Sequence, residues 1–310
     1  MKVAIIGRTK FLLESARYLL KHGHSIPLVW TCPAEAYYGV DGDDFESLAK
    51  AAGAIFIKDT RINNPDNIAF IKDTGCDAAV SVNWPTIISE GVIRSFPKGI
   101  LNAHAGDLPR YRGNATVNWA ILMGEPFVGV CIHYMVPELD AGNVLVRRHI
   151  PLEADTYIGE VYDRMAELIP EMFLAAVDGL EHGMTAEEPQ STEPSDILHC
   201  YPRRKEDGRI DWSGPVEKIY RLIRASSRPF SGAYSFFEGR LKATVWRAQP
   251  VSSRWKFLAV PGQVCHRLEG DPVVACGDGM LRLTDIEVEG AENAEEGKHI
   301  VCRSTRSRLL

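Results

Sequence analysis

The chain has 310 residues, 45% of them hydrophobic, a formal net charge of −6 and an isoelectric point near 5.9. Such a length allows one large core and a second smaller one, because a domain usually takes about 100–200 residues. The negative balance argues against a strongly cationic nucleic-acid surface over the whole chain. The charge is uneven, however, since residues 1–200 sum to −11 and residues 201–310 to +5. The positive charge of residues 201–310 could form a weak binding site for a polyanion. A solvated surface is the more common explanation of such a charge balance.

Neither a membrane span nor a targeting segment is visible in the sequence. No run reaches the roughly 18 apolar residues that a membrane helix needs. The opening MKVAIIG lacks the apolar region and the cleavage site of a signal peptide. We therefore expect a soluble, cytoplasmic protein. The seven cysteines are widely spaced without a CxxC pair, which predicts reduced core thiols and no metal site.

The first part of the chain alternates short apolar runs with amphipathic stretches. Strands are expected at residues 2–6, 25–30, 54–57 and 77–82, and helices at 11–20, 44–52 and 66–74. This alternation is typical of an α/β, Rossmann-like, doubly wound domain with a mostly parallel sheet. Ligands of such sheets lie beyond the carboxyl ends of the strands. The first strand ends without G-x-G-x-x-G, and no G-x-x-x-x-G-K-[ST] occurs, so we expect neither a dinucleotide cofactor nor a phosphate-binding loop.

The pattern then changes toward a second domain. A strand at 99–104, a helix at 115–123, adjacent strands at 127–135 and 143–150, and a long helix at 156–183 are expected. A segment rich in Pro, Glu, Ser and Thr suggests a linker. After a helix at 215–226, alternating runs broken by glycines indicate a small OB-like β-barrel, and the acidic stretch 287–296 is expected to be an exposed loop. The expected domains are 1–185, a linker at 186–211, and 212–310.

Three polar residues are candidates for catalysis. Asn102 and His104 end an apolar strand and share one of its faces, because side chains two apart on a strand point the same way. The amide could stabilise an oxyanion while the imidazole exchanges a proton near neutral pH. Asp140, in a loop between Pro137 and Gly142, could orient that imidazole. Without a family pattern, an Asn and a His at a strand end are as often structural, and an Asp before Ala-Gly is usually a turn residue.

The segments NAHAGDLPRYRGNATVNWAI and GVCIHYMVPELDAGNVL resemble the catalytic core of the folate-dependent formyltransferases. The family pattern joins N-x-H, a Leu-Pro loop leading to Y-R-G, and an aspartate in an L-D-[AG]-G loop. All three parts occur here, at residues 102–104, 108–113 and 139–142. The region from YPRRKEDGRIDW onward also resembles the barrel domain of methionyl-tRNA formyltransferase and of the formyltransferase half of the aminoarabinose-modifying enzyme. The resemblance covers nearly the whole chain.

The resemblance implies 10-formyltetrahydrofolate as formyl donor, a primary amine as acceptor and no metal. It assigns oxyanion stabilisation to Asn102 and protonated His104, proton transfer to His104, and orientation of that imidazole to Asp140. Trp84 could wall the donor pocket or be a core residue. The residues expected at the donor are Trp84, Thr86, Ile87, Ile88, Asn114, Val136, Pro137, Glu138 and Leu139.

The sequence departs from the family pattern close to the catalytic histidine. The common S-L-L-P is A-G-D-L-P here, with Gly106 and Asp107, and the arginine that often follows Y-R-G is Asn114. Asp107 either recognises the acceptor amine or belongs to a simple turn. Arg110 and Arg112 remain possible anion partners, although Arg112 could equally tie the loop down. The expected acceptor contacts are Asp107, Arg110, Tyr111 and Arg112.

The acceptor is expected to be a nucleotide-linked amino sugar, with UDP- or dTDP-4-amino-deoxysugars favoured, in lipopolysaccharide or other surface glycan biosynthesis. The acidic catalytic half and the lack of a Lys/Arg-rich insertion near residues 32–45 argue against nucleic acid as partner. One alternative is methionyl-tRNA formyltransferase, favoured by the basic C-terminal third. Another is a non-catalytic folate or nucleotide-sugar binding protein. A homodimer is possible, and no membrane partner is expected. Candidates for stacking on a base are Tyr37, Tyr38, Tyr111 and Trp119.

Overall fold

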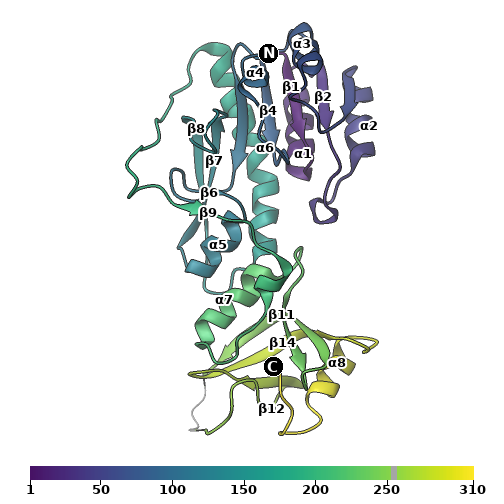
Figure 1. Cartoon of the computed structure of the whole chain (residues 1–310), viewed down its shortest axis with the longest axis vertical. Helices are drawn as coiled ribbons and strands as arrows, with labels where there is room; N and C mark the ends of the chain where they lie inside the picture. Colours follow the sequence, from purple (N-terminus) through teal and green to yellow (C-terminus); the bar gives the residue numbers. More distant parts are fainter. Residues whose placement is uncertain (253–256) are drawn as a thin grey trace. The chain divides into compact units, whose positions relative to one another are not determined.

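The computed structural model describes residues 1–252 and 257–310, which form two compact units (Figure 1). The first unit consists of Met1–Thr116, Phe127–Pro151 and Tyr162–Tyr201. The second consists of Val117–Pro126, Leu152–Val161 and Pro202–Leu310. The chain therefore passes between the units several times, and each unit is assembled from separate segments.

The first unit is built on a seven-stranded sheet with the order β3-β2-β1-β4-β5-β7-β8. β1 to β5 pair in parallel, the order of the strands reverses between β1 and β4, and β7 and β8 are antiparallel to their neighbours. This confirms the predicted doubly wound, mostly parallel sheet. The strands are β1 Val3–Gly7, β2 Leu28–Thr31, β3 Ile55–Lys58, β4 Ala78–Val82, β5 Ile100–His104, β7 Phe127–Tyr134 and β8 Val144–Pro151.

Helices pack on both faces of this sheet, which is why its central strands are entirely buried. α1 contacts β1 and β4, and α2 contacts β2 and β3. Ile71 of α3 and Val92 of α4 share a core cluster with Ile6 and Trp30. Because side chains alternate along a strand, Val3 and Ile5 face the other layer. The helices are α1 Lys10–Lys21, α2 Gly42–Ala52, α3 Pro65–Asp73, α4 Glu90–Ile93, α6 Ile158–His182 and the 3₁₀ turn η1 Ala36–Tyr38.

The longest helix, α6, has 25 residues. Its fully buried positions, among them Val161, Ile169 and Phe173, recur every three or four residues and form one apolar stripe. Full burial of a side chain such as Phe173 stabilises the fold by roughly 1.5–3 kcal/mol. Most of the exposed positions of this helix are acidic. Within residues 1–252 and 257–310, no helix is long and apolar enough to cross a membrane.

The second unit contains the predicted small antiparallel β domain, with the strand order β10-β11-β14-β13-β12. Residues 307–310 join its two edge strands, because Val264 N–H donates to the Ser307 oxygen at 3.1 Å and Phe236 N–H to the Leu310 oxygen at 3.0 Å. The sheet is thereby closed into a barrel. Its elements are α5 Thr116–Met123, 3₁₀ turn η2 Lys205–Gly208, α7 Val216–Ser226, β10 Ala233–Phe237, β11 Leu241–Val251, β12 Val264–Leu268, β13 Asp271–Ala275, β14 Met280–Val288 and α8 Ala294–Val301.

The acidic stretch 287–296 is only in part the exposed loop that the sequence suggested, because residues 289–293 form that loop between β14 and α8. Its first two residues complete β14, and its last three open α8. The Asn293 side chain accepts a hydrogen bond from Glu296 N–H at 3.0 Å and caps this helix. Acidic residues are favourable in a first helical turn, where they face the positive end of the helix dipole. The stretch therefore consists of the end of a strand, a loop and the start of a helix.

The segment predicted as a linker has contacts within each unit. Residues 186–201 belong to the first unit, where β9, His199–Cys200, pairs in parallel with β6, Arg112–Gly113. Residues 202–211 belong to the second unit, and Ile210 is part of its core. The domain boundaries at 185 and 211 stay a prediction.

Candidate active site

The candidate site begins at the carboxyl end of β5, beside the antiparallel strand β7. Asn102 and His104 lie on one face of β5 and are only 9% and 7% exposed. In the β5–β7 register, His133 stands opposite Asn102 and Cys131 opposite His104. Strand pairing therefore adds a second imidazole, that of His133, to the two side chains predicted from the sequence.

Asp140 reaches the same place from the loop between β7 and β8. Its Oδ2 lies 3.5 Å from Nδ1 of His104, and its Oδ1 lies 3.6 Å from Nε2 of His133. Oδ2 also accepts a hydrogen bond from Gly113 N–H at 2.8 Å. The backbone of Asp140 has a φ of 52°, in the left-handed region that few non-glycine residues adopt. The structure thus brings Asn102, His104 and Asp140 together, while their catalytic roles stay predictions.

Both ring nitrogens of His104 face hydrogen-bond acceptors. Nε2 lies 2.6 Å from the backbone oxygen of Tyr111, and Nδ1 faces the Asp140 carboxylate. Neither partner can donate a proton, so both contacts are made only when each ring nitrogen carries one. These two contacts therefore fix the orientation of the His104 ring.

His133 is a site residue that the sequence reasoning missed. Burial and the neighbouring charge of His104 lower the pKa of His133 to about 4, so its ring is neutral at pH 7. Nδ1–H donates to the Tyr134 oxygen at 2.8 Å, which leaves Nε2 to accept from the Asn102 amide at 3.1 Å. An amide group has two N–H bonds, so one remains for an oxyanion. His133 thereby fixes the direction in which Asn102 points.

The loop from Gly106 to Tyr111 lies directly against His104. A Cβ atom on Gly106 would stand 2.6 Å from Nε2 of His104, and one on Gly129 of β7 would stand 2.5 Å from Cα of Asp107. No side chain fits at such distances, so both positions require glycine for close approach. The departure of Gly106 from the family serine therefore leaves room for the contact between His104 and Tyr111.

The carboxylate of Asp107 is already paired with two side chains of β8. Its Oδ1 accepts a hydrogen bond from Nη1 of Arg147 at 2.7 Å and lies 3.1 Å from Nε2 of His149. Arg147 also reaches Glu188 at 2.8 Å. This pairing favours the loop-turn alternative for Asp107 over direct recognition of an amine.

An Asp107→Asn substitution distinguishes the two roles. If Asp107 anchors the loop beside His104, kcat for formyl transfer falls by about tenfold, because small displacements of catalytic groups slow a reaction strongly. The KM for the acceptor then stays within about twofold of wild type. Steady-state kinetics measure both, with Asp196→Asn, an exposed aspartate of the same unit, as control. A raised acceptor KM at unchanged kcat would instead assign Asp107 to acceptor recognition.

Arg112 is 2% exposed, and its guanidinium has partners within its own unit. Nε and Nη2 donate to Oε1 of Gln190 at 3.1 and 2.8 Å, and Nη1 donates to Glu138 at 3.0 Å. These bonds favour the alternative in which Arg112 ties the loop down. The guanidinium of Arg110 lies 5.7 Å from the centre of the Tyr111 ring.

The residues expected at the formyl donor lie in two loops of the first unit. After β4, Trp84 Nε1 donates to Thr86 Oγ1 at 3.0 Å, and the side chain of Ile87 is 76% exposed. Ile88 is instead buried in the core, so only its backbone could contact a ligand. In the loop before Asp140 the side chains from Val136 to Leu139 are exposed, and Asn114 is exposed as well. The large apolar side chains exposed in these two loops are Ile87, Val136 and Leu139.

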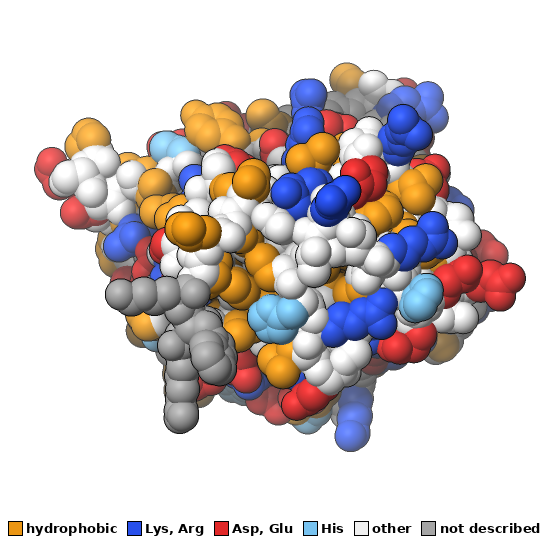
Figure 2. Space-filling model, turned by 90° about the horizontal axis from the view of Figure 1, so that it is seen from below, with side chains coloured by type: hydrophobic (Ala, Val, Ile, Leu, Met, Phe, Trp, Pro, Cys, Tyr) orange, Lys and Arg blue, Asp and Glu red, His pale blue; other side chains and the backbone are white. Residues whose placement is uncertain are grey.

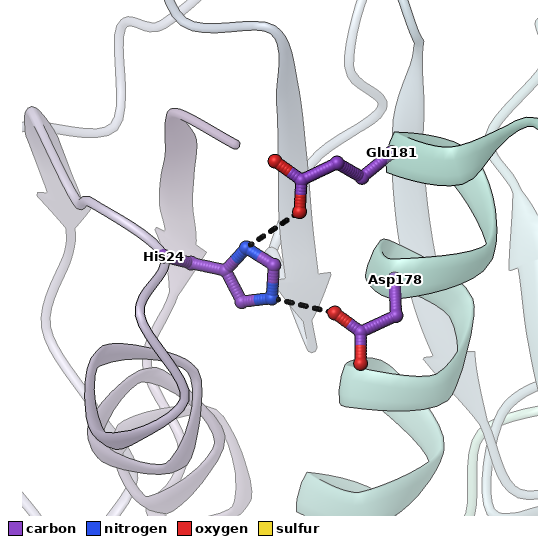
Figure 3. Close-up of side chains that lie close together, drawn as sticks. All are labelled: His24, Asp178 and Glu181. Carbon is purple, nitrogen blue, oxygen red and sulfur yellow. Dashed lines mark hydrogen bonds and ion pairs between the residues drawn. The ribbon is translucent and has the colours of Figure 1, made fainter.

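A separate cluster of potential metal ligands lies away from this site (Figure 3). The buried His24 precedes β2, and the carboxylates of Asp178 and Glu181 project toward it from α6. His24 Nε2 lies 3.0 Å from Asp178, and Nδ1 lies 3.7 Å from Glu181. The carboxylates thus contact opposite edges of the ring, and Glu181 also pairs with the Met1 amino group at 2.7 Å. This arrangement is that of a paired buried histidine.

The chain belongs to the formyl transferase family. The family model named Formyl transferase matches residues 1–177, and the model named Formyl transferase, C-terminal domain matches residues 203–299. A methionyl-tRNA formyltransferase of Symbiobacterium thermophilum is 33% identical over 94% of this chain and 89% of its own length. Seven further curated relatives with the same name are 26–30% identical. Membership of the predicted family is confirmed.

Solved structures share the fold at lower identity. HypX from Aquifex aeolicus in complex with tetrahydrofolic acid has a TM-score of 0.64 at 19% identity over 92% of this chain, which spans 44% of HypX. The N-formyltransferase of Helicobacter canadensis with folinic acid and dTDP-3-aminofucose has a TM-score of 0.64 at 16% identity, covering 91% and 98% of the two chains. At these identities the likeness shows the fold alone.

The curated relatives overturn the expectation of a nucleotide-linked amino sugar acceptor and of a chain without a nucleic-acid partner. They are named methionyl-tRNA formyltransferase and align over at least 94% of this chain. The expected role in lipopolysaccharide or other surface glycan biosynthesis depended on a sugar acceptor, so it is withdrawn together with that acceptor. The expectation was wrong because a net charge sums the whole chain, whereas a polyanion needs only a local basic surface.

Proposed function

We propose that this chain is a methionyl-tRNA formyltransferase, which transfers the formyl group of 10-formyltetrahydrofolate to the α-amine of methionine on its tRNA. The observation that carries this proposal is the match to curated relatives of that name along both parts of the chain. Folate ligands in two solved structures of the same fold support the choice of donor. Formyl transfer itself is the activity of the family.

In this proposal Asn102, His104 and Asp140 act together in the transfer. Bound 10-formyltetrahydrofolate supplies the electrophilic formyl carbon. The amine nitrogen bonds to that carbon, the bond from the carbon to N10 breaks, and the proton lost by the amine ends on N10. Asn102 donates its second N–H to the carbonyl oxygen while that oxygen carries negative charge, and the positive charge of a protonated His104 close by adds electrostatic stabilisation. His104 moves the proton, and Asp140 holds the ring in its charged orientation.

In this proposal, catalysis and tRNA binding belong to different parts of the chain. Residues 1–185 carry the chemistry, and residues 212–310, beyond the linker at 186–211, contribute contacts to tRNA phosphates. The basic balance of the C-terminal third supports this assignment. Figure 2 shows a face of the second unit from below, where Lys and Arg side chains are spread among apolar, neutral and acidic ones. Exposed arginines of this region include Arg240, Arg267, Arg303 and Arg306.

The function is tested by incubating the full chain with 10-formyltetrahydrofolate and methionyl-tRNA, then releasing the amino acid and identifying formylmethionine by mass spectrometry. Free methionine serves as the control for recognition of the tRNA. We expect turnover only with charged tRNA. The KM for tRNA should rise steeply between about 50 and 200 mM salt, because phosphate contacts release counterions. Formylation of free methionine at the same rate, or no formylmethionine at all, would sink the proposal.

A further inference from the structure

A segment that follows α6 crosses the candidate site. We call residues 187–200 the strap. Glu188 exchanges two backbone hydrogen bonds with Val144 of β8, at 2.8 and 2.9 Å, and β9 at the far end of the strap pairs with β6. Most strap side chains between these points are exposed, and Gln190 is one of the few that are partly buried. The strap therefore touches both segments that flank the Asp140 carboxylate.

The side chain of Gln190 makes four hydrogen bonds. Its Oε1 accepts from Nε and Nη2 of Arg112, at 3.1 and 2.8 Å. Its Nε2 donates to the backbone oxygens of Asp140 and Gly142, both at 2.7 Å. The two donors and two lone pairs of the amide are all used. Turning the amide over would set N–H against guanidinium and oxygen against carbonyl, so its orientation is fixed.

The hydrogen bonds of Gln190 hold the two chain segments that form the contact between Gly113 and Asp140. Arg112 immediately precedes Gly113, whose N–H donates to Oδ2 of Asp140 at 2.8 Å. Gln190 therefore binds Arg112 on one side of the Gly113–Asp140 hydrogen bond and the Asp140 loop on the other side. The left-handed backbone of Asp140 persists only where surrounding contacts hold it. The 3.5 Å separation between Asp140 and His104 is already long for a hydrogen bond, so a small movement of the loop would break it.

We propose that Gln190 is a positioning residue for Asp140, although the two are 50 residues apart and Gln190 lies in the segment predicted as a linker. It touches no reacting atom. Its amide holds the Asp140 loop and the Arg112–Gly113 segment together, so that the carboxylate faces His104. The kinetic consequence rests on the proposed function; the structural consequence does not.

Amide hydrogen exchange tests the positioning directly in the full chain. Gln190→Glu keeps an acceptor for Arg112 but loses both donors to the Asp140 loop, whereas Gln190→Met loses all four bonds. We expect the Gly113 amide to exchange more than about tenfold faster in both variants, while the Val80 amide in β4 is unchanged. Ser191→Ala, which alters the next strap residue, should match wild type. A wild-type exchange rate at Gly113 in Gln190→Glu would overturn the proposal.

Kinetics then test whether Gln190 acts through Asp140. We expect kcat for methionyl-tRNA to fall about 10- to 100-fold in Gln190→Glu, with both KM values within about twofold. Adding Gln190→Glu to Asp140→Asn should cost less than about another twofold, because residues that act as one unit are not additive. Additive losses would overturn the proposal. A wild-type chain inactive on methionyl-tRNA would sink the proposed function, and the Gly113 exchange rates would still decide the role of Gln190.

Discussion

Replacing Asp140 with asparagine is expected to lower kcat for formyl transfer by about 10²- to 10⁴-fold, the range in which positioned acid–base groups act. The amide oxygen of asparagine can still accept the hydrogen bond from Gly113 N–H. The negative charge that faces His104 at 3.5 Å is lost, however, and with it the stabilisation of the imidazolium. Initial rates with saturating donor and acceptor measure the effect.

The loss should appear in kcat and leave folding and ligand binding intact, because the substitution changes few atoms. Thermal unfolding and the KM for each substrate report on these. Asp163→Asn removes an exposed aspartate of α6 and provides the matched control. Turnover of Asp140→Asn within about twofold of wild type would refute the assignment of Asp140 as the partner of His104.

The second large effect is on stability in acid and arises from His133. The pKa of this ring is about 4 in the folded chain because burial disfavours its charged form, whereas an unfolded histidine has a pKa of about 6.5. Between these values the unfolded chain binds a proton that the folded chain does not. The free energy of unfolding therefore decreases as the pH falls from about 6.5 to 4, by on the order of 3 kcal/mol from this residue.

A His133→Gln variant lacks that titration while keeping an oxygen that can accept from Asn102. We expect its free energy of unfolding to depend less on pH across the same window, as measured by urea unfolding of the first unit at several pH values. His199→Gln, which removes an exposed histidine, should retain the wild-type dependence. Equal pH profiles for His133→Gln and wild type would show that His133 does not stay neutral in the folded chain.

Much of the first unit could be predicted from the sequence because its signals are local. Buried parallel strands read as apolar runs, and the helices between them have amphipathic periodicity. Asn102 and His104 share a strand face by simple alternation, and the family pattern joined Asp140 to them. The closing of the barrel by residues 307–310 depends on pairing between distant segments, which no local pattern encodes.

Two residues near the site, His133 and Gln190, were missed for the same reason, because their contacts join distant segments of the chain. His133 meets Asn102 only because β7 pairs with β5 in one register, and a shift of one residue would turn it to the other face. Gln190 lies in a stretch whose composition resembles a linker, and its three partner residues are separated from it by tens of residues. The acceptor was misjudged because charge was weighed over half of the chain at once. The family motifs thus predicted formyl transfer, whereas the spatial partners of these residues became visible only in the fold.

A competition assay tests the central claim most directly. The chain is mixed with isotopically labelled 10-formyltetrahydrofolate and equal concentrations of methionyl-tRNA and a dTDP-linked amino sugar, and the destination of the label is measured. We expect the label to appear on methionine, at a kcat/KM at least about 10³-fold above that for the sugar, a discrimination that contacts along tRNA can supply. Label on the sugar with none on methionine would contradict it.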